Sequence, residues 1–398
     1  MAHSHSHDTD VSVPSSVKKA VVFTLIPMIA LVILGLILLW PSGDGPTLET
    51  PDFVRGTVTA VETCPETNDP DCLLITVVVD EGPDEGVTST VRVNAGAAVP
   101  DFTVGTEVYL TPIPEALPGE NQYALVDIDR TKPILLLTVI TALAVVLLAG
   151  WKGVSAIVGL VASLMLLGVF VLPALVEGAP PVAVAAVGAG AIAIVSMGFA
   201  HGLRVLTGVA LIGTLIALLL TTLLGWVFTE LMNFTGVASD DAAYLGAVAD
   251  EIDLEGLLLA GLVIGAMGVL DDVTVTQAST VWEVHGADQR LDLWQLVAAG
   301  MRVGKDHVAA VVNTLVLAYV GASLPLFLLI TMSDAPIWQS LSNEAIATEI
   351  VRSLVGALGI IAAVPITTSL AAVVLVGLRR KRSGSYSPYG GDNQGEHV

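Results

Sequence analysis

Long apolar runs that are almost free of charged residues recur along this chain and constrain its fold more than any other feature. Each run is at least 18 residues long, which lets a helix cross a hydrocarbon core of roughly 30 Å. Hydrophobic residues make up 54% of the chain and charged residues 14%, so a soluble fold could not bury the apolar surface. The sequence therefore predicts a polytopic α-helical membrane protein in a lipid bilayer.

About eight transmembrane helices are expected. Their apolar runs cover residues 20–40, 133–150, 154–172, 181–200, 203–228, 256–282, 307–332 and 350–378. The first run follows Lys18 and Lys19 and has no small-residue cleavage site before Pro41. It is therefore interpreted as an uncleaved anchor and not as a signal peptide.

The charged residues between these runs alternate in sign and predict the orientation. Basic residues fall at Lys18 and Lys19, Lys152, Arg204, 290–305 and 379–382, whereas acidic loops surround Glu177, 240–255 and 334–349. The positive-inside rule then predicts a protein of the cell membrane with both termini in the cytoplasm. The net charge of −22 is interpreted as a solvated acidic exterior. A nucleic-acid partner is excluded because the few Lys and Arg residues cluster at helix ends and form no basic face.

Residues 41–132 differ from the rest of the chain and predict a β domain. Strand-like segments at 53–61, 73–79, 88–93 and 107–111 are separated by Gly, Pro and Asp, and side chains alternate in polarity within 57–61. A small closed barrel of the OB type fits this pattern best. The orientation places the domain outside the cytoplasm, where it could bind an envelope protein.

The two cysteines of the chain, Cys64 and Cys72, lie on either side of a turn-rich segment in this domain. An oxidising compartment favours a disulfide that closes a hairpin. Zinc is disfavoured because the domain contains no further Cys or His ligand, and weak calcium binding by the loop acids is the remaining alternative.

Five segments follow from these features: a tail at 1–19, an anchor at 20–40, the β domain at 41–132, a seven-helix membrane domain at 133–380 and a tail at 381–398. Both tails are expected to be cytoplasmic and disordered, since they are polar. His3, His5 and His7 in the first tail form at most a weak, unselective metal site. No cofactor is predicted.

Two adjacent carboxylates, Asp271 and Asp272, interrupt the middle third of the run 256–282. A charge at that depth costs several kcal/mol unless it is paired, hydrated or neutralised. Burial and mutual repulsion both favour the protonated form, which suits a proton carrier. Alternatively, the helix ends near Leu270 and the aspartates lie among headgroups, although no helix breaker follows in 273–282.

Polar residues at similar depth extend this pair into a candidate proton relay. Its members are Asp271, Asp272, Thr274, Gln277, Asn313 and Thr314. Asn313 and Thr314 lie about ten residues into the next expected span, so they could meet Asp272. Lys305 and His307 form either a proton exit or a positive-inside flank, and 365–368 either supplies hydroxyls and free carbonyls or only bends the last helix.

The segment 268–279, with the sequence Gly-Val-Leu-Asp-Asp-Val-Thr-Val-Thr-Gln-Ala-Ser, is followed by Trp282-Glu283. It resembles the signature of YibE/F-like membrane proteins. The order of anchor, β domain and helical block agrees over residues 20–380. The resemblance implies a multi-pass membrane protein and, by itself, no particular activity.

The stretch 265–275 is also similar, more weakly, to the acidic helix of RND-type efflux pumps and of the protein-export subunits SecD and SecF. That resemblance implies proton coupling at Asp271 and Asp272. This chain differs in having two additional helices before the acidic one and a much smaller exterior domain.

Two functional hypotheses remain. The first is a proton-coupled transporter or energy-transducing subunit that moves an unknown solute or drives the β domain. The second is a non-transporting scaffold whose β domain binds an envelope protein. An enzyme is disfavoured because the chain contains no His-Glu-x-x-His or Gly-x-Ser-x-Gly motif, and adjacent aspartates on one helix point about 100° apart.

Overall fold

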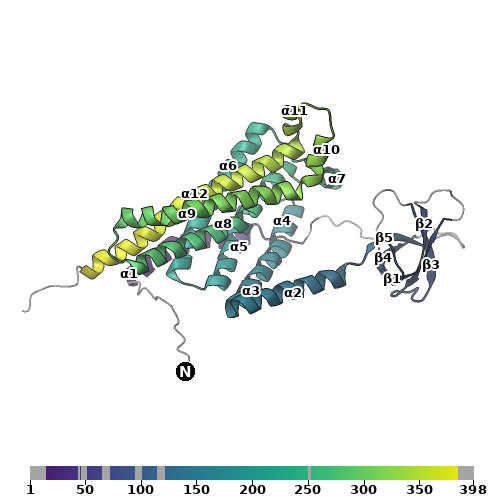
Figure 1. Cartoon of the computed structure of the whole chain (residues 1–398), viewed down its shortest axis with the longest axis horizontal. Helices are drawn as coiled ribbons and strands as arrows, with labels where there is room; N and C mark the ends of the chain where they lie inside the picture. Colours follow the sequence, from purple (N-terminus) through teal and green to yellow (C-terminus); the bar gives the residue numbers. More distant parts are fainter. Residues whose placement is uncertain are drawn as a thin grey trace, which may run out of the picture. The chain divides into compact units, whose positions relative to one another are not determined.

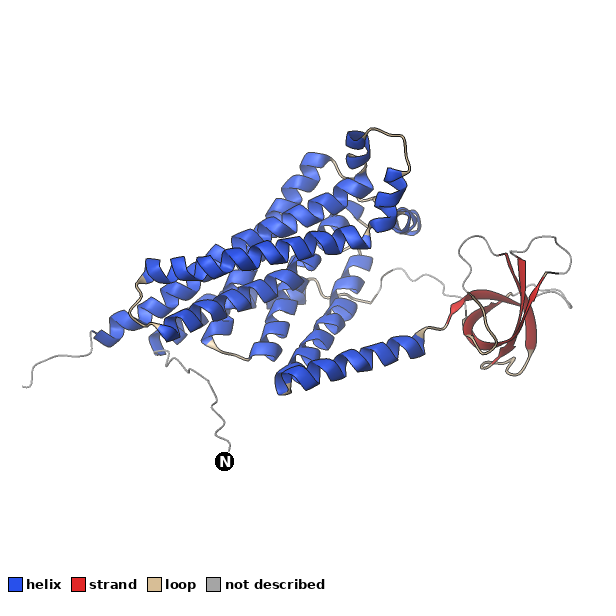
Figure 2. Cartoon of the chain, in the orientation of Figure 1, coloured by secondary structure: helices blue, strands red, loops and turns tan. Residues whose placement is uncertain are grey.

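The computed structural model describes residues 15–43, 45, 52–64, 72–94, 101–113, 122–249 and 252–383. The chain divides into two compact units. One contains α1 and every helix from α3 onward, and the other contains the β-strands together with α2. Figures 1 and 2 show both units, which are described separately below.

All regular secondary structure described in the larger unit is helical. They are α1 (Ser15–Leu38), α3 (Trp151–Leu166), the π-helical turn η1 (Leu167–Val171), α4 (Leu172–Val176), α5 (Pro181–His201), α6 (Val205–Met232), α7 (Asp240–Val248), α8 (Leu254–Ala287), α9 (Leu293–Ala322), α10 (Leu324–Thr331), α11 (Ile337–Leu341) and α12 (Glu344–Ser383). Together with α2 (Thr131–Ala149), the described residues contain eight helices long and apolar enough to cross a membrane. The expected number of apolar helices of membrane-spanning length is confirmed for these residues.

The seventh span differs in its bounds from the expected run 307–332. Helix α9 begins at Leu293, where the Asp292 side chain and Gln295 form a reciprocal capping box. It ends at Ala322, and a separate short helix, α10, follows with Pro325 in its first turn. Proline lacks a backbone N–H, so Pro325 cannot form the backbone hydrogen bond that would join α10 to the last turn of α9. The apolar run therefore spans two helices, which hydropathy alone does not distinguish.

The tails are also shorter than expected. Helix α1 already begins at Ser15, and α12 continues to Ser383. Residues 1–14, with His3, His5 and His7, lie outside the described residues, as do residues 384–398.

Helix α8 is the central element of the helical unit and packs against α5, α6, α9 and α12. Its Leu259, Val263 and Leu270 are buried in one core with Ala193 of α5 and Ile360 of α12. Apolar and small side chains fill this core because close approach of helices in a membrane depends on packing and not on water exclusion. Figure 1 shows α8 in the interior of the bundle.

The helices of this unit alternate in direction. Helices α8 and α12 are parallel, since Gly261 lies near Arg352 and Gln277 near Thr368. Helix α6 is antiparallel to both. At its crossing with α12, a Cβ atom added at Gly213 would collide with the Thr367 hydroxyl. Glycine is therefore required there for the two backbones to approach.

The smaller unit contains five strands: β1 (Val54–Thr63), β2 (Cys72–Val79), β3 (Thr88–Asn94), β4 (Glu107–Pro112) and β5 (Tyr123–Ile128). They form one antiparallel sheet with the order β3-β2-β1-β4-β5, and the edge strands β3 and β5 also approach each other. The result is a small half-barrel. Four strands agree with the sequence prediction, and β5 was not predicted.

Alternating side chains fill the half-barrel. Ile75, Val77 and Val79 of β2 are buried at every second position, together with Val58 and Leu110. Cys64 and Cys72 form a disulfide with a Cα–Cα distance of 5.3 Å, within the usual range. This pairing agrees with the prediction.

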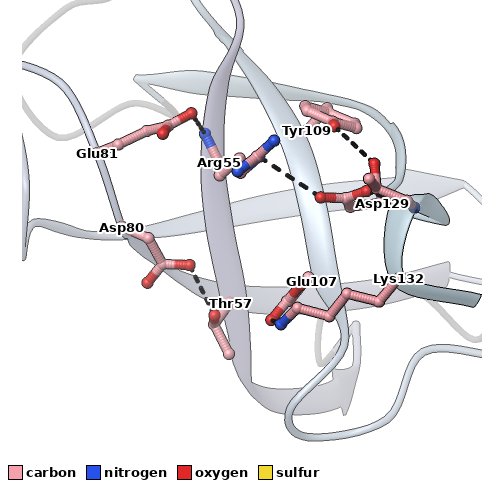
Figure 3. A network of polar contacts seen from close by, with 9 residues as sticks. Arg55, Thr57, Asp80, Glu81, Glu107, Tyr109, Asp129 and Lys132 are labelled. Carbon is pink, nitrogen blue, oxygen red and sulfur yellow. Dashed lines mark hydrogen bonds and ion pairs between the residues drawn. The ribbon is translucent and has the colours of Figure 1, made fainter. Parts of the chain in front are cut away.

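A network of polar side chains joins the sheet to α2 (Figure 3). The Asp129 carboxylate accepts a hydrogen bond of 2.8 Å from the Thr131 backbone N–H and lies 3.5 Å from the Arg55 guanidinium. Lys132 forms an ion pair with Glu107. The hydrogen bonds from Thr131, together with Arg55, hold the pKa of Asp129 below its usual value. Asp129 thus caps α2 as a carboxylate and fixes its start to β1.

Candidate functional site

The aspartate pair lies within a continuous helix. Helix α8 runs without interruption from Leu254 to Ala287, so Asp271 is near its midpoint. The alternative in which the helix ends near Leu270 is wrong. At about 1.5 Å per residue, more than 20 Å of helix extends on each side of Asp271.

Asp271 contacts α5. The Ser196 hydroxyl donates a hydrogen bond of 2.5 Å to Asp271 Oδ2. The other carboxyl oxygen, Oδ1, is buried, and within the described part of the chain it has no hydrogen-bond partner. His201, at the C-terminal end of α5, is close enough for an electrostatic interaction with Asp271. One carboxyl oxygen is therefore satisfied and the other is not.

Asp272 lies on a different face of α8. It is exposed, as are Gly261, Gly265, Gly268 and Thr276, which recur every three or four residues along the same side of the helix. Adjacent helical residues differ by about 100° in direction, which explains why Asp271 faces α5 while Asp272 does not. The structure thus separates two residues that the sequence presented as a pair.

Thr274 is completely buried and links α8 to α6. Its hydroxyl lies 2.6 Å from the Thr214 hydroxyl and donates to the Asp271 backbone carbonyl at 3.1 Å. The Thr214 hydroxyl then donates its own hydrogen to Thr274, and the Ala210 carbonyl at 3.1 Å is the alternative acceptor for that hydrogen. Hydroxyls that bond to one another and to the backbone in this way carry no net charge into the core.

Gln277 connects α8 with both α9 and α12. Its Nε2 donates to the Gly300 carbonyl at 3.0 Å and to the Thr368 hydroxyl at 2.6 Å. The Thr368 hydroxyl in turn donates a hydrogen bond to the Val364 carbonyl, also at 2.6 Å. Both polar side chains are buried and hydrogen-bonded, as a stable interior requires. Thr368, noted in the sequence as a possible hydroxyl donor, is thus part of the network.

Asn313 and Thr314 do not join this network. Both are exposed on α9, and Thr314 donates to the Ala310 carbonyl of its own helix. No hydrogen bond between described residues links either one to Asp272. Gly304 faces Gln277, and Asn313, nine residues further along, lies about half a turn away on the opposite side of the helix. Matching depth therefore did not imply contact.

Three residues of the site carried no signal in the sequence. Ser196, His201 and Thr214 lie on α5 and α6, far from the acidic helix in the chain. Ser196 is one hydroxyl in an apolar run, and Thr214 is one of several threonines in α6. Only the packing of α5 and α6 against α8 gives them a role.

Metal chemistry has no support in the part of the chain that the structure describes. No group of three or more His, Cys, Asp or Glu side chains lies close enough there to hold a metal ion.

A family model described as YibE/F-like protein matches residues 137–377, which is more than half of the chain. This protein belongs to the YibE/F-like family. The matched region contains every residue of the site described above. Comparison with curated proteins and with solved structures finds no match.

Proposed function

We propose that this YibE/F-like protein is a proton-coupled membrane protein, either a transporter or an energy-transducing subunit, in which Asp271 binds and releases the proton. One observation carries the proposal: a carboxyl group at the midpoint of an apolar helix has one oxygen bonded to Ser196, and its other oxygen is buried with no hydrogen-bond partner among the described residues. The proposed role is not catalytic.

The chemistry follows from that asymmetry. An ionised carboxylate would keep a buried, charged oxygen without a donor, which is costly in a membrane interior. The neutral carboxyl avoids this cost, so we assign the protonated state to the arrangement described here. Release of the proton then requires a different arrangement, in which donors or water reach Oδ1. Such a change in surroundings is what couples a proton to a movement.

His201 and Asp272 supply routes toward this carboxyl. His201 interacts electrostatically with Asp271 from the end of α5 where the basic residues gather. Imidazole exchanges protons near neutral pH. Asp272 is exposed on another face of α8, so a partner of the helical unit can reach it. The proposal assigns His201 to the cytoplasmic branch of the route and Asp272 to the second branch.

The distribution of charge supports the proposed orientation in the cell membrane. Lys18, Lys152 and Arg204 lie where α1, α3 and α6 begin, whereas Glu177 and Glu344 lie at the opposite end of the bundle. The positive-inside rule then assigns both termini to the cytoplasm. The β unit follows the end of α1 in the chain, so we propose an extracytoplasmic location for it. Its strand order, with β3 near β5, supports a barrel of the OB type.

Proton uptake by purified protein in liposomes tests the role of Asp271. Asp271→Asn should abolish uptake, since the amide cannot bind a proton at neutral pH, while insertion and abundance stay normal. Asp272→Asn is the matched control, because it makes the same chemical change one residue away. We expect it to slow uptake without abolishing it. Full activity in Asp271→Asn would disprove the proposal.

A non-transporting scaffold is the second candidate, and the interior hydrogen bonds favour it. Thr274 and Gln277 both form hydrogen bonds to neighbouring helices, as expected for residues that only hold helices together. In that case the β unit would carry the function by binding an envelope protein. Asp271→Asn would then lower stability at most, and deletion of residues 42–132 would remove all function. Crosslinking through the β unit would identify the partner.

A further inference from the structure

Two glutamates at the acidic end of the helical unit make the same set of contacts. The Glu177 carboxylate accepts hydrogen bonds from the Ser42 N–H at 2.8 Å, the Ser42 hydroxyl at 3.0 Å and the Gly43 N–H at 2.6 Å. The Glu344 carboxylate accepts from the Thr235 N–H at 2.8 Å, the Thr235 hydroxyl at 2.9 Å and the Gly236 N–H at 2.8 Å. We call each arrangement a clasp.

The clasps occupy equivalent places in the chain. Ser42-Gly43 follows α1, and Thr235-Gly236 follows α6. Glu177 shortly precedes α5, and Glu344 begins α12. Each clasp therefore ties the helix that opens a group of four long helices to the start of the helix that closes it. The first group is α1, α2, α3 with α4, and α5; the second is α6, α8, α9 with α10, and α12.

The third helix of each group is interrupted in the same way. Helix α3 passes through η1 into the short α4, which begins Leu172-Pro173. Helix α9 ends and the short α10 begins Leu324-Pro325. In both helices proline occupies the first turn, where its missing N–H costs least.

The last helix of each group carries a matching glycine. Val187-Gly188-Ala189 in α5 and Val355-Gly356-Ala357 in α12 have the same sequence, 11 and 12 residues after Glu177 and Glu344. A Cβ added at Gly188 would meet Val171, and one at Gly356 would meet Leu315. The third and fourth helices of each group thus cross closely at the equivalent glycine. Four independent features agree.

The two groups differ in their second helix. Helix α8 carries Asp271 and Asp272, whereas α2 contains no ionisable residue after Lys132. Ser196 belongs to α5 of the first group, and Asp271 to α8 of the second. The hydrogen bond between them therefore crosses the boundary between the groups.

From these observations we infer that the order of membrane-length helices along the chain is an internal duplication of a four-helix pattern. We propose that, within the helical unit, α1 with α3–α5 and α6 with α8–α12 move against each other as two bodies about the Ser196–Asp271 contact. In each half, the clasp links the first helix to the last. The protonation state of Asp271 determines whether the Ser196–Asp271 contact between the halves persists. Repeats that rock against each other around a central site are a common design in transporters. This inference rests on the proposed function and adds the moving parts to it.

Few ionisable groups face Asp271 from the surrounding helices. His201 does so from α5 and Asp272 from α8 itself. Helix α6 has no ionisable residue between Val205 and Thr229, and α12 has none between Ser353 and Gly377. On α9, Lys305, Asp306 and His307 lie near the middle of the helix, next to Gly304, which faces Gln277 and not Asp271. His201 and Asp272 are therefore the groups to control for in a pH experiment.

Spin-label distances in full-length protein test this inference. Lys152, Gly286 and Gly377 are exposed positions on α3, α8 and α12, and the native cysteines are joined in a disulfide. Labels at Lys152 and Gly377, or at Lys152 and Gly286, measure across the halves, whereas labels at Gly286 and Gly377 measure within the second half. Between about pH 5 and about pH 8, the two cross-half distances should shift on the order of 2–5 Å. The within-half distance should stay constant.

Asp271→Asn should remove the shift. Asp272→Asn and His201→Gln should change only the rate at which the proton reaches Asp271, so the distances measured at equilibrium should still shift with pH. If the within-half distance changes as much as the cross-half distances, the two-body movement is wrong. If no distance changes although native vesicles take up protons through Asp271, this inference is wrong while the proposed function stands. If the cross-half shift persists in Asp271→Asn, the halves do move but Asp271 does not control them, which contradicts both the assigned contact and the proposed function.

Discussion

Two aspartates of this protein have opposite surroundings. Asp129, at the junction of β5 and α2, receives a hydrogen bond from the Thr131 N–H on one oxygen and faces the Arg55 guanidinium with the other. Asp271, at the midpoint of α8, receives one hydrogen bond from Ser196, and its second oxygen is buried and receives none from any residue that the structure describes. The first carboxylate is stabilised as an anion and serves the fold. The second is not, which makes it suitable for exchanging a proton.

The comparison teaches that residue type and adjacency to a helix do not assign a role. Both side chains are aspartates that contact a hydroxyl residue, and both belong to or precede a membrane-length helix. They differ in the number of donors on the charged oxygens and in the presence of a cation. These are properties of the folded chain.

The largest expected effect separates the two carboxyls directly. Asp271→Asn should reduce proton uptake in liposomes at least tenfold, whereas Asp129→Asn should leave it unchanged, because Asp129 stays ionised and acts as a cap. Uptake is followed with a pH-sensitive dye inside the vesicles. Equal loss of uptake in both variants would contradict the distinction.

A smaller effect is expected from Ser196, which sharpens the comparison by removing the one donor to Asp271. Ser196→Ala should change the uptake rate about threefold to tenfold, as expected for a net hydrogen-bond free energy of about 0.5–1.5 kcal/mol. The pH at which uptake is half-maximal should shift as well. Ser196→Thr restores a hydroxyl and should recover both values. A merely structural serine would alter abundance and leave the pH profile in place.

The neutral part of the network should affect stability and not proton uptake. Thr368→Val removes one acceptor of the buried Gln277 amide and should lower the free energy of unfolding by about 1–3 kcal/mol. Thr314→Val makes the same change at an exposed hydroxyl bonded within its own helix and should be nearly neutral. Thermal unfolding in detergent measures both. Loss of proton uptake in Thr368→Val with normal stability would place Gln277 on the proton route.

The smallest effects concern the pH dependence of the β unit. Hydrogen bonds from the Ile128 N–H and Arg130 lower the pKa of Asp127, and those from Thr131 lower the pKa of Asp129. Both carboxylates therefore add stability above about pH 4, and this stability is lost as the pH falls through their folded-state pKa values. Circular dichroism of Asp127→Asn and Asp129→Asn variants should show a weaker dependence on acid.

Tyr123 should make the stability of the β unit depend on pH in the alkaline range. Burial and the hydrogen bond of 2.6 Å to Asp84 raise its pKa to about 12. The neutral phenol adds stability that is complete below about pH 10 and is lost as the pH rises toward 12. Ultraviolet absorbance should show late tyrosine ionisation, and Tyr123→Phe should reduce its amplitude by one tyrosine. An early transition would contradict the buried Tyr123–Asp84 contact.

The sequence by itself determined the elements of this protein. Hydropathy gave the number of spans, because burial in lipid requires long apolar runs whatever their neighbours are. Alternation and turn residues predicted four of the five strands, and local spacing predicted the Cys64–Cys72 disulfide. The absence of a helix breaker after Leu270 correctly predicted that α8 continues through the aspartates. All of these depend on residues close together in the chain.

Only the tertiary structure decided which of these residues meet. Ser196 is 75 positions from Asp271 and Thr368 is 91 positions from Gln277, so no local pattern connects them. Asn313 lies at a depth similar to that of Asp272 but on the opposite side of α9 from Gln277. The adjacent residues Asp271 and Asp272 face different directions because a helix turns about 100° per residue. Helix identity follows from short-range periodicity, whereas contact depends on how whole helices rotate and cross when their glycines and threonines pack.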